Sequence, residues 1–176
     1  MVCARPDPAA LMVTLRAAVP ADQPQLEAWE AEPHVRQAGI DGWDWAGMLG
    51  EDPPWRSLLI AMLGERPIGL LQIIDPARED TRYWGDCGPG LRAIDIWIGA
   101  PDCLRQGHGR AMMSQAIDRC FAAPEVGAIL IDPLASNHSA HRFYRALGFH
   151  PVAPRRFGTD DCLVFRLNRA EWRAGD

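Results

Sequence analysis

The sequence predicts one mixed α/β domain, and three observations lead to this fold class. Apolar runs of strand length alternate with segments in which apolar residues recur at helical spacing. The 176 residues suit one domain of ordinary size, and no repeat or low-complexity linker marks a boundary inside it. The expected order of elements is β-α-(α)-β-β-β-α-β-α-β-β.

The N-terminal third begins with a short strand over residues 13–16. Asp22 is placed to cap a helix over residues 23–29, because a short polar side chain at this position can accept a hydrogen bond from the first turn. Residues 32–50 predict one or two short helices, interrupted at Gly39–Gly42.

The middle third predicts strands. Apolar runs over residues 57–63 and 68–74 are joined by G-E-R-P, a signal for a β-hairpin. A long polar loop over residues 75–90 follows, and residues 91–98 predict a strand that contains one charge, Asp95. Strand alternation places Asp95 on the face opposite the neighbouring isoleucines.

The C-terminal third begins with the stretch L-R-Q-G-H-G-R-A-M-M, which leads into an amphipathic helix. Helical spacing is kept by five side chains: Met113, Ala116, Ile117, Cys120 and Phe121. A short buried strand over residues 128–131 and a second helix over residues 140–147 follow. Gly148–Phe149 ends that helix and opens a strand, and a last strand covers residues 161–167.

Composition narrows the class of protein. The net charge of -5 argues against a general nucleic-acid binder and is compatible with a cationic substrate. No apolar run approaches the roughly 18–20 residues that span a bilayer, and Asp7 and Pro8 interrupt what a signal peptide would need. We therefore expect a cytoplasmic protein with no membrane partner. Reduced thiols are expected because the cysteines are odd in number and lack a C-x-x-C: Cys3, Cys87, Cys103, Cys120 and Cys162.

The stretch from Leu104 to Met113 predicts a phosphate-binding loop or, equally well on its own, a glycine-rich turn before a core helix. Glycines let backbone N–H groups converge on one point, and a helix N-terminus adds unpaired donors and partial positive charge. A Rossmann loop would need Gly or Ala where Met112 stands, and a P-loop would need G-K-[ST], which is absent. The candidate binding residues are Arg105, Gln106, Gly107, His108, Gly109 and Arg110.

Together with a second block, this loop resembles the GNAT superfamily of acetyl-CoA-dependent N-acetyltransferases. The family loop reads Q/R-x-x-G-x-G/A, and here Leu104 stands in its first position. The block Asp132–Phe149 is similar to the family's N-x-x-A-x-x-x-Y-x-x-x-G-F signature, with Asn137, Ala140, Tyr144, Gly148 and Phe149 in register. The resemblance implies a single-domain GNAT fold, a mixed, mostly antiparallel twisted sheet flanked by helices. The domain would cover residues 13–170, between an extension over 1–12 and a tail over 171–176.

Within the superfamily the chain resembles aminoglycoside 6′-N-acetyltransferases, on the elements E-R-P-I-G, G-P-G-L-R-A-I-D and I-D-P. The resemblance implies that Asp95 is the catalytic base and that Asp132 lines the acceptor pocket. Acids of the long loop join them as candidates for binding the acceptor: Glu79, Asp80 and Asp86. Of four clustered tryptophans (Trp43, Trp45, Trp55 and Trp84), Trp84 is taken into the acceptor site. Core packing or a stacking wall for a sugar ring explains the cluster equally well.

The resemblance also implies the roles on the donor side. Acetyl-CoA is the expected cosubstrate, with its pyrophosphate on the loop and its pantetheine arm along Trp97, Ile98 and Gly99. Tyr144 would protonate the leaving thiolate, and Asn137 would bind coenzyme A, cap its helix, or do both. From the residues alone, Asp95 on an exposed sheet face and Tyr144 in the core are the alternatives. No metal is expected, because the histidines His108, His138 and His141 form no ligand set, and His108 is expected to face solvent.

The predicted function is acetyl transfer to a primary amine of a small polycationic acceptor, by direct attack in a ternary complex. An aminoglycoside is the plausible acceptor, with antibiotic resistance as the associated role. The alternatives are an N-acetyltransferase for another amine (a protein N-terminus, a lysine-like siderophore precursor or a metabolite) and a non-catalytic acyl-CoA-binding sensor. The expected assembly is a monomer or a homodimer, without nucleic acid.

Overall fold

The computed structural model describes residues 12–172, so that the predicted N-terminal extension lies outside the described residues except for Met12. One seven-stranded sheet in the order β1-β2-β3-β4-β5-β7-β6 forms the centre. Its strands are β1 (Val13–Ala17), β2 (Arg56–Leu63), β3 (Arg66–Ile74), β4 (Leu91–Ile98), β5 (Ala128–Ile131), β6 (His150–Phe157) and β7 (Asp160–Asn168). All neighbouring strands are antiparallel except β4 and β5, which confirms the mixed, mostly antiparallel sheet.

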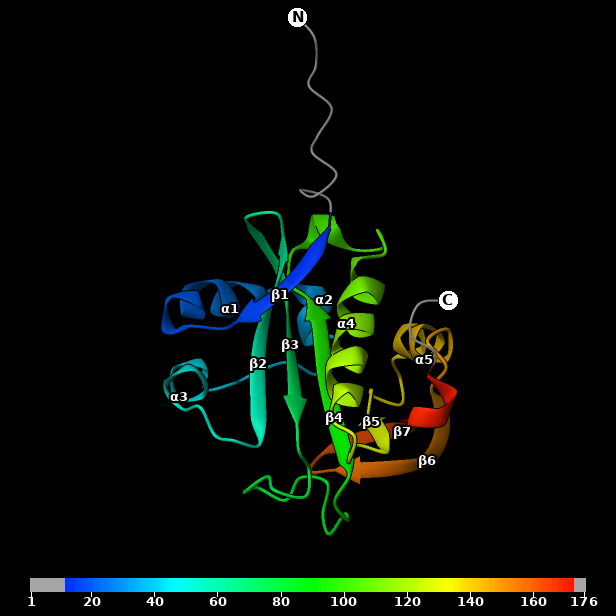
Figure 1. Cartoon of the computed structure of the whole chain (residues 1–176). Helices are drawn as coiled ribbons and strands as arrows, with labels where there is room; N and C mark the ends of the chain where they lie inside the picture. Colours follow the sequence, from blue (N-terminus) through cyan, green and yellow to red (C-terminus); the bar gives the residue numbers. More distant parts are fainter. Residues whose placement is uncertain (1–11, 173–176) are drawn as a thin grey trace, which may run out of the picture.

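Helices cover both faces of this sheet (Figure 1). The α-helices are α1 (Gln23–Glu30), α2 (Pro33–Arg36), α3 (Trp45–Gly50), α4 (His108–Ala122) and α5 (His138–Arg145). Three 3-10 turns add η2 (Pro20–Asp22), η3 (Pro101–Cys103) and η4 (Arg169–Glu171). The predicted strands and helices are all present, and two short helices follow α1 on either side of Gly39 and Gly42, as the glycines indicated.

At the start of the domain, the contacts of Asp22 differ from the expected ones. Asp22 occupies the N-cap position of α1, but its side chain makes no capping bond to the helix. Its carboxylate instead accepts two hydrogen bonds from Arg16, at 2.6 and 2.7 Å, and one from the Val19 N–H, because the 3-10 turn before α1 turns it back toward β1. At the other end, Trp172 donates from its indole to Asp118 on α4, at 2.8 Å.

Strand β4 separates the two layers of the core. Ile94 packs with α4 residues such as Met113 and Ile117, while Trp97 packs on the opposite face with α1 and α3. Gly99, just beyond the strand, lies so close to α1 that an added Cβ would be 2.0 Å from the Trp29 ring. The alternation of β4 therefore points Asp95 away from α4, toward the side that carries α1–α3, as predicted.

Strands β4 and β5 pair only over a short stretch. Their parallel register joins Leu91–Ala93 to Ala128–Leu130, and the rest of β4, Ile94–Ile98, has no β5 partner among the described residues. The Gly99 N–H donates to Ile68 of β3 at 2.9 Å. Because peptide groups alternate in direction along a strand, those of Ile96 and Ile98 face the opposite, open side. The sheet thus opens a gap that exposes backbone hydrogen-bonding groups.

Candidate active site

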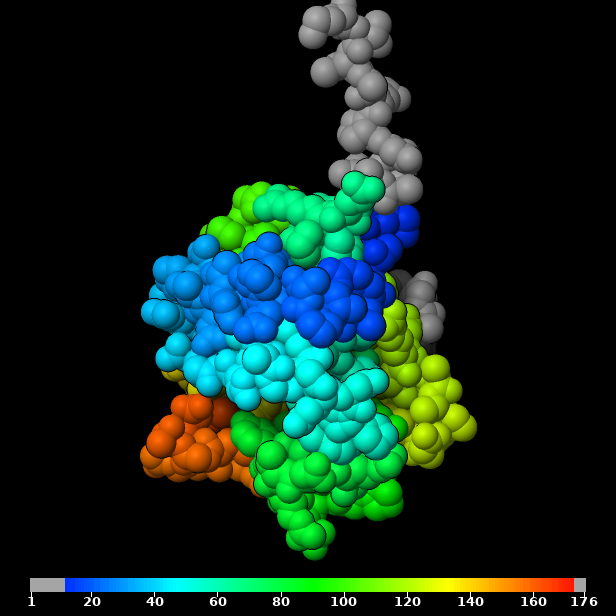
Figure 2. Space-filling view, turned by 90° about the vertical axis from the view of Figure 1, so that its left-hand side faces the viewer, coloured from blue at the N-terminus to red at the C-terminus, as the bar shows by residue number. Residues whose placement is uncertain are grey.

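A cavity of about 410 Å³ opens on the sheet face that carries α1–α3. Figure 2 shows this side of the molecule, where α1–α3 (blue to cyan) lie above the loop of residues 75–90 (green) and beside the β6–β7 turn (orange), with a hollow between them. Five acidic residues line the cavity: Asp41, Glu79, Asp95, Asp132 and Asp160. No arginine or histidine is among the residues that line it, so its interior is strongly acidic.

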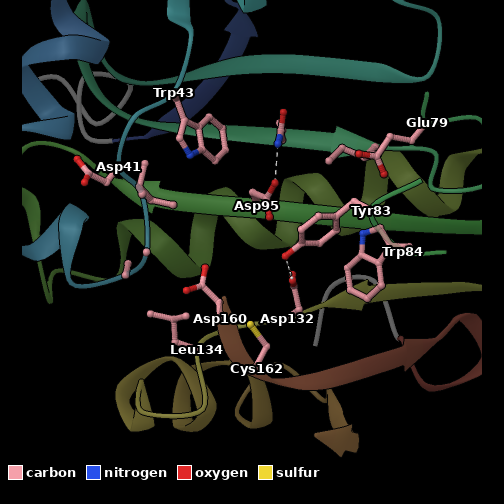
Figure 3. Close-up of a pocket in the computed structure, with 15 residues that line it drawn as sticks. Asp41, Trp43, Glu79, Tyr83, Trp84, Asp95, Asp132, Leu134, Asp160 and Cys162 are labelled. Atoms are coloured by element: carbon pink, nitrogen blue, oxygen red, sulfur yellow. Dashed lines mark hydrogen bonds between the residues drawn. The ribbon is translucent and has the colours of Figure 1, made fainter. Parts of the chain in front are cut away.

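Asp95 lies in the middle of β4, directly opposite Gln72 of β3. The Gln72 side-chain N–H donates to Asp95 Oδ2 at 2.5 Å (Figure 3). Burial raises the pKa of Asp95 above its ordinary value, the bond from Gln72 opposes that shift, and the charge of Glu79 adds to it. A carboxylate with a raised pKa is a better proton acceptor than an ordinary aspartate.

Asp132 follows β5 and faces the same cavity. The Tyr83 hydroxyl donates to its Oδ2 at 2.6 Å, and the Tyr83 ring stacks on Phe157 of β6 with 4.5 Å between ring centroids. Burial, reinforced by the charge of Asp95, raises the pKa of Asp132 to about 7. Asp132 therefore gains and loses its proton near neutral pH, in a way that depends on the charge of Asp95.

The acids of the long loop fall into two groups. Glu79 lines the cavity, where its Oε1 accepts from Thr81 at 2.5 Å and its Oε2 is buried without a hydrogen-bond partner. Asp80 instead accepts from the Trp55 indole at 3.3 Å, and Asp86 is exposed; neither lines the cavity. The loop turns sharply at residues with positive φ, including Arg82 and Gly85, so successive acids point in different directions.

Sequence reasoning missed several residues of this cavity. Asp41 lies between the two glycines that interrupt the short helices, and Asp160 opens β7 after the hairpin turn. In Figure 3 Asp160 points toward the cavity, whereas the Asp41 carboxylate points away from it and lies 3.8 Å from the Arg36 guanidinium. Gln72 and Tyr83 were also missed. The only sequence signal was a polar side chain next to a Gly-rich turn for the acids, and one amide inside an apolar strand for Gln72.

The four tryptophans divide between the two readings that the sequence left open. Trp43 and Trp84 line the cavity. Trp45 is buried against Trp43 and Trp97, and its indole donates to Glu30 at 2.5 Å. Trp55 lies outside the cavity. Trp84 is only 5% exposed and belongs to the core as well, so of the two tryptophans that line the cavity only Trp43 is partly exposed.

The predicted phosphate loop runs into the N-terminus of α4, as expected. Arg105 and Gly107 both have positive φ, and a Cβ on Gly107 would meet nothing within 4 Å. The first turn of an α-helix leaves its N–H groups without intrahelical partners. An open space beside unpaired amides, next to the gap between β4 and β5, fits the pyrophosphate of a nucleotide cosubstrate.

The side chains of this loop differ in their contacts and in their exposure. The exposed Arg105 makes no ion pair among the described residues, whereas Arg110 donates to the Ala146 carbonyl at 3.2 Å and Gln106 to the Asp102 carbonyl. His108 does not face solvent as expected: it is only partly exposed, and its Nε2 is buried without a partner. The ring at the first position of α4 is thus partly covered by the fold, and the loop carries two guanidinium groups, those of Arg105 and Arg110.

The end of β4 offers a narrower set of groups than its sequence suggested. The Trp97 side chain is part of the core, and the Gly99 N–H is taken by Ile68. The Ile98 carbonyl contacts His34 Nε2 at 2.9 Å. The open-side peptide groups belong to Ile96 and Ile98, and Ile96 was absent from the predicted set.

Helix α5 holds the two residues of the second motif. Asn137 caps the helix, because its Oδ1 accepts from the Ala140 N–H at 3.0 Å. Tyr144 is buried beside Phe149 and Phe165, and does not line the cavity. Burial raises the pKa of Tyr144 above its ordinary value, and the charges of Asp95 and Asp132 raise it further. Its hydroxyl is therefore protonated at neutral pH and lies within electrostatic reach of both aspartates.

No helix within residues 12–172 is long and apolar enough to cross a membrane. Within the same residues, no group of three or more His, Cys, Asp or Glu side chains is arranged to hold a metal ion.

Comparison with known proteins identifies the family to which this chain belongs. Residues 18–157 match the family described as an acetyltransferase (GNAT) domain. Over 91 residues the chain is 34% identical to aminoglycoside N(6′)-acetyltransferase type 1 of Klebsiella pneumoniae, a stretch that covers 51% of this chain and 45% of that protein. The matched stretch therefore spans less than half of that relative.

Solved structures agree on the fold. The structure of AAC(6′)-Ib in complex with ribostamycin and coenzyme A superposes with a TM-score of 0.80 at 25% identity, covering 91% of this chain and 95% of that one. Spermidine N-acetyltransferase from Vibrio cholerae, in complex with coenzyme A and spermine, superposes with a TM-score of 0.72 at 16% identity, covering 91% and 97%. The second likeness concerns the fold alone.

Proposed function

Because this chain belongs to the GNAT acetyltransferase family, we propose that it transfers the acetyl group of acetyl-CoA to a primary amine of a small polycationic acceptor. The observation that carries the proposal is the cavity with five acidic residues and no basic side chain. Its relatives make an aminoglycoside, acetylated at the 6′ amine, the acceptor of choice.

The donor side of the proposal uses the gap between β4 and β5. The loop Arg105–Arg110 would hold the pyrophosphate through backbone N–H groups, with Gly107 leaving the space open and Arg105 adding charge. The peptide groups of Ile96 and Ile98 would pair with the pantetheine arm. When bound, acetyl-CoA supplies an activated thioester; the protein holds it against the cavity, and proximity supplies much of the rate.

The acceptor side uses the acids and the aromatic wall. Acidic residues from five separate segments surround the cavity, so that several ammonium groups of one molecule can be paired at once. Trp43 lines the cavity and is partly exposed, so a sugar ring can stack on its flat apolar face, whereas Trp84 is only 5% exposed and serves as a packed part of the wall. A small, acidic cavity that opens to one side suits such a molecule better than it suits an extended peptide.

The chemical step needs one base and one acid. The amine nitrogen attacks the thioester carbon, a C–N bond forms, and the C–S bond breaks. Asp95 takes the proton that the attacking nitrogen loses, directly or through water, and Tyr144 donates a proton to the departing thiolate. Raised pKa values suit both roles, since Asp95 then accepts a proton more readily and Tyr144 keeps its own.

The test is a thiol-release assay of the purified protein with acetyl-CoA and a panel of amines. We expect turnover with an aminoglycoside that carries a 6′ amine and none with a matched aminoglycoside that carries a hydroxyl there. Turnover with peptides or simple metabolite amines alone would overturn the choice of acceptor. Acetyl-CoA binding without turnover of any amine would show a sensor instead of an enzyme.

A further inference from the structure

Gln72 has a role that neither of the sequence motifs assigns. It lies in β3, is only 6% exposed, and lines the acceptor cavity. Its side-chain N–H is bonded to Asp95, while its Oε1 is buried and has no hydrogen-bond partner among the described residues. We propose that Gln72 positions both partners of the proton transfer: its N–H fixes Asp95, and its carbonyl oxygen accepts a hydrogen bond from the amine that Asp95 deprotonates. This inference rests on the proposed function.

The orientation of the Gln72 amide is determined by its neighbour. Turned the other way, its carbonyl oxygen would face the Asp95 carboxylate, and two acceptors would repel each other. The N–H must therefore point to Asp95, which leaves the carbonyl oxygen without a partner on a side chain that lines the cavity. A buried carbonyl without a partner is costly, and an incoming donor removes that cost.

An ammonium or amine group is the donor that fits. A protonated amine has three N–H bonds and no acceptor. The acidic cavity presents a second orphan acceptor, Glu79 Oε2, which is also buried without a partner. Figure 3 shows Glu79 and Asp95 facing the same space. The neutral Gln72 Oε1 and the anionic Glu79 Oε2 thus both lack a hydrogen-bond partner. Two such acceptors near a candidate base suit the reacting amine better than an anion or a hydrocarbon.

Glutamine alone among the uncharged side chains of this length can do both tasks. Leucine would leave Asp95 without its donor, and glutamate would set a second negative charge against it. The cross-strand register, in which Gln72 stands directly opposite Asp95, holds the amide on a rigid element, so that the direction of both hydrogen bonds is fixed.

Gln72→Leu tests the proposal, with Gln115→Leu as the matched control. Gln115 lies on α4, away from the cavity, and its side-chain N–H donates to the Val13 carbonyl at 2.9 Å. We expect Gln72→Leu to lower kcat/KM for a 6′-amino aminoglycoside by roughly 10- to 100-fold, the loss of one or two hydrogen bonds to charged groups. KM for acetyl-CoA should not change, and Gln115→Leu should retain the wild-type kinetics.

The pH profile separates positioning from mere stabilisation. Because the bond from Gln72 holds the pKa of Asp95 down, its loss should move the acidic limb of the kcat/KM profile to higher pH. An unmoved limb together with near-normal kcat/KM would overturn the proposal, and so would an equal fall in Gln115→Leu. If Gln72→Leu does not fold, Gln72→Asn, whose amide is one methylene group too short, should show the same shift; wild-type behaviour in that variant would count against the role.

Failure of the proposed function can be distinguished from failure of this inference. If the wild-type protein acetylates no amine, the acceptor assignment falls. The Asp95 carboxyl titration, followed by carbon-13 NMR, still measures the link to Gln72. A titration that does not move between wild type and the Gln72 variants would overturn the link whatever the enzyme's substrate.

Discussion

Asp95 combines three properties that are rare in one carboxylate: a central strand position, a hydrogen bond from a neutral amide, and a second carboxylate near enough to raise its pKa. The charge of Asp95 in turn raises the pKa of Asp132. A change at Glu79 is therefore expected to alter the titration of Asp95, and a change at Asp95 to alter that of Asp132.

Asp95→Asn should separate catalysis from donor binding. The amide keeps the size of the side chain but cannot take a proton, so we expect acetyl transfer to fall by about 100-fold or more, within the range of general base catalysis. Thiol release measures the rate, and calorimetry measures the affinity for acetyl-CoA, which should stay within about twofold because the donor site lies beyond the strand. Equal activity in the variant would remove Asp95 from the mechanism.

Asp132 should make acceptor binding depend on pH near neutrality. Its pKa of about 7 lies above the ordinary value, so the carboxylate is mostly protonated at pH 6 and mostly ionised at pH 8. A cation binds the ionised form better, and affinity should therefore rise with pH, by roughly fivefold for one partly screened ion pair.

A guanidinylated aminoglycoside is the suitable probe, because its own charge is constant over this range. Calorimetry at pH 6 and pH 8 would measure the step in affinity. In Asp132→Asn the step should flatten. A step of full size in that variant would assign the titration to another group.

Individual residues differ in whether the sequence alone identifies them as part of the site. Asp95 and Asp132 are identifiable because each lies in a short motif, A-I-D or I-D-P, that resembles the aminoglycoside 6′-N-acetyltransferases. Gln72 is not, because one amide inside an apolar strand is ordinary, and only its partner across the sheet makes it unusual. Asp41 and Asp160 belong to turns without periodicity, so nothing in the sequence states where their side chains point.

At the level of elements, regular hydrogen bonding makes strands and helices predictable, whereas the loop over residues 75–90 has no such repeat. Its path depends on contacts with distant segments, such as the stacking of Tyr83 on Phe157 of β6. The sequence therefore places Glu79, Asp80 and Asp86 equally near the acceptor, and the fold separates Glu79 from the other two.

The loop before α4 supports a prediction at this scale. Gly107→Val should weaken binding of coenzyme A by at least tenfold, roughly 1.4 kcal/mol or more, because the side chain would enter the open space beside the unpaired amides. Calorimetry measures the affinity, and thermal unfolding measures the separate cost of a branched residue at positive φ.

Gly158→Val is the matched control for that strain. Gly158 also has positive φ and nothing within 4 Å of a Cβ, but it lies in the turn between β6 and β7. It should lose similar stability and keep its affinity for coenzyme A. A comparable loss of affinity in both variants would show that strain, not the loop, is responsible.

Across the whole molecule, the acidic residues are unevenly distributed. The net charge of -5 is modest, yet five acidic residues line one cavity. All 18 basic residues are arginines, so no lysine side chain competes with the acceptor amine for the acetyl group.

This distribution predicts strong dependence on ionic strength. Between about 20 mM and 500 mM salt, kcat/KM for an acceptor with four or five ammonium groups should fall by roughly tenfold, because screening weakens both steering and binding. Steady-state assays with a second acceptor of fewer amines provide the comparison, and its slope should be shallower. Identical slopes for the two acceptors would argue against multiple ion pairs in the cavity.

The outer edge of the sheet limits how copies of this protein can meet. Strand β6 is the last in the order, and its residues His150–Arg156 are all exposed. Pro151 and Pro154 have no N–H to offer a neighbour, the register slips between Pro151 and Ala153, and two consecutive arginines follow. An incoming strand would find missing donors, a broken repeat and like charges, so β6 is protected against edge-to-edge aggregation. A high concentration of this protein should therefore be tolerated without sheet extension along that edge, which leaves the hairpin free to border the cavity.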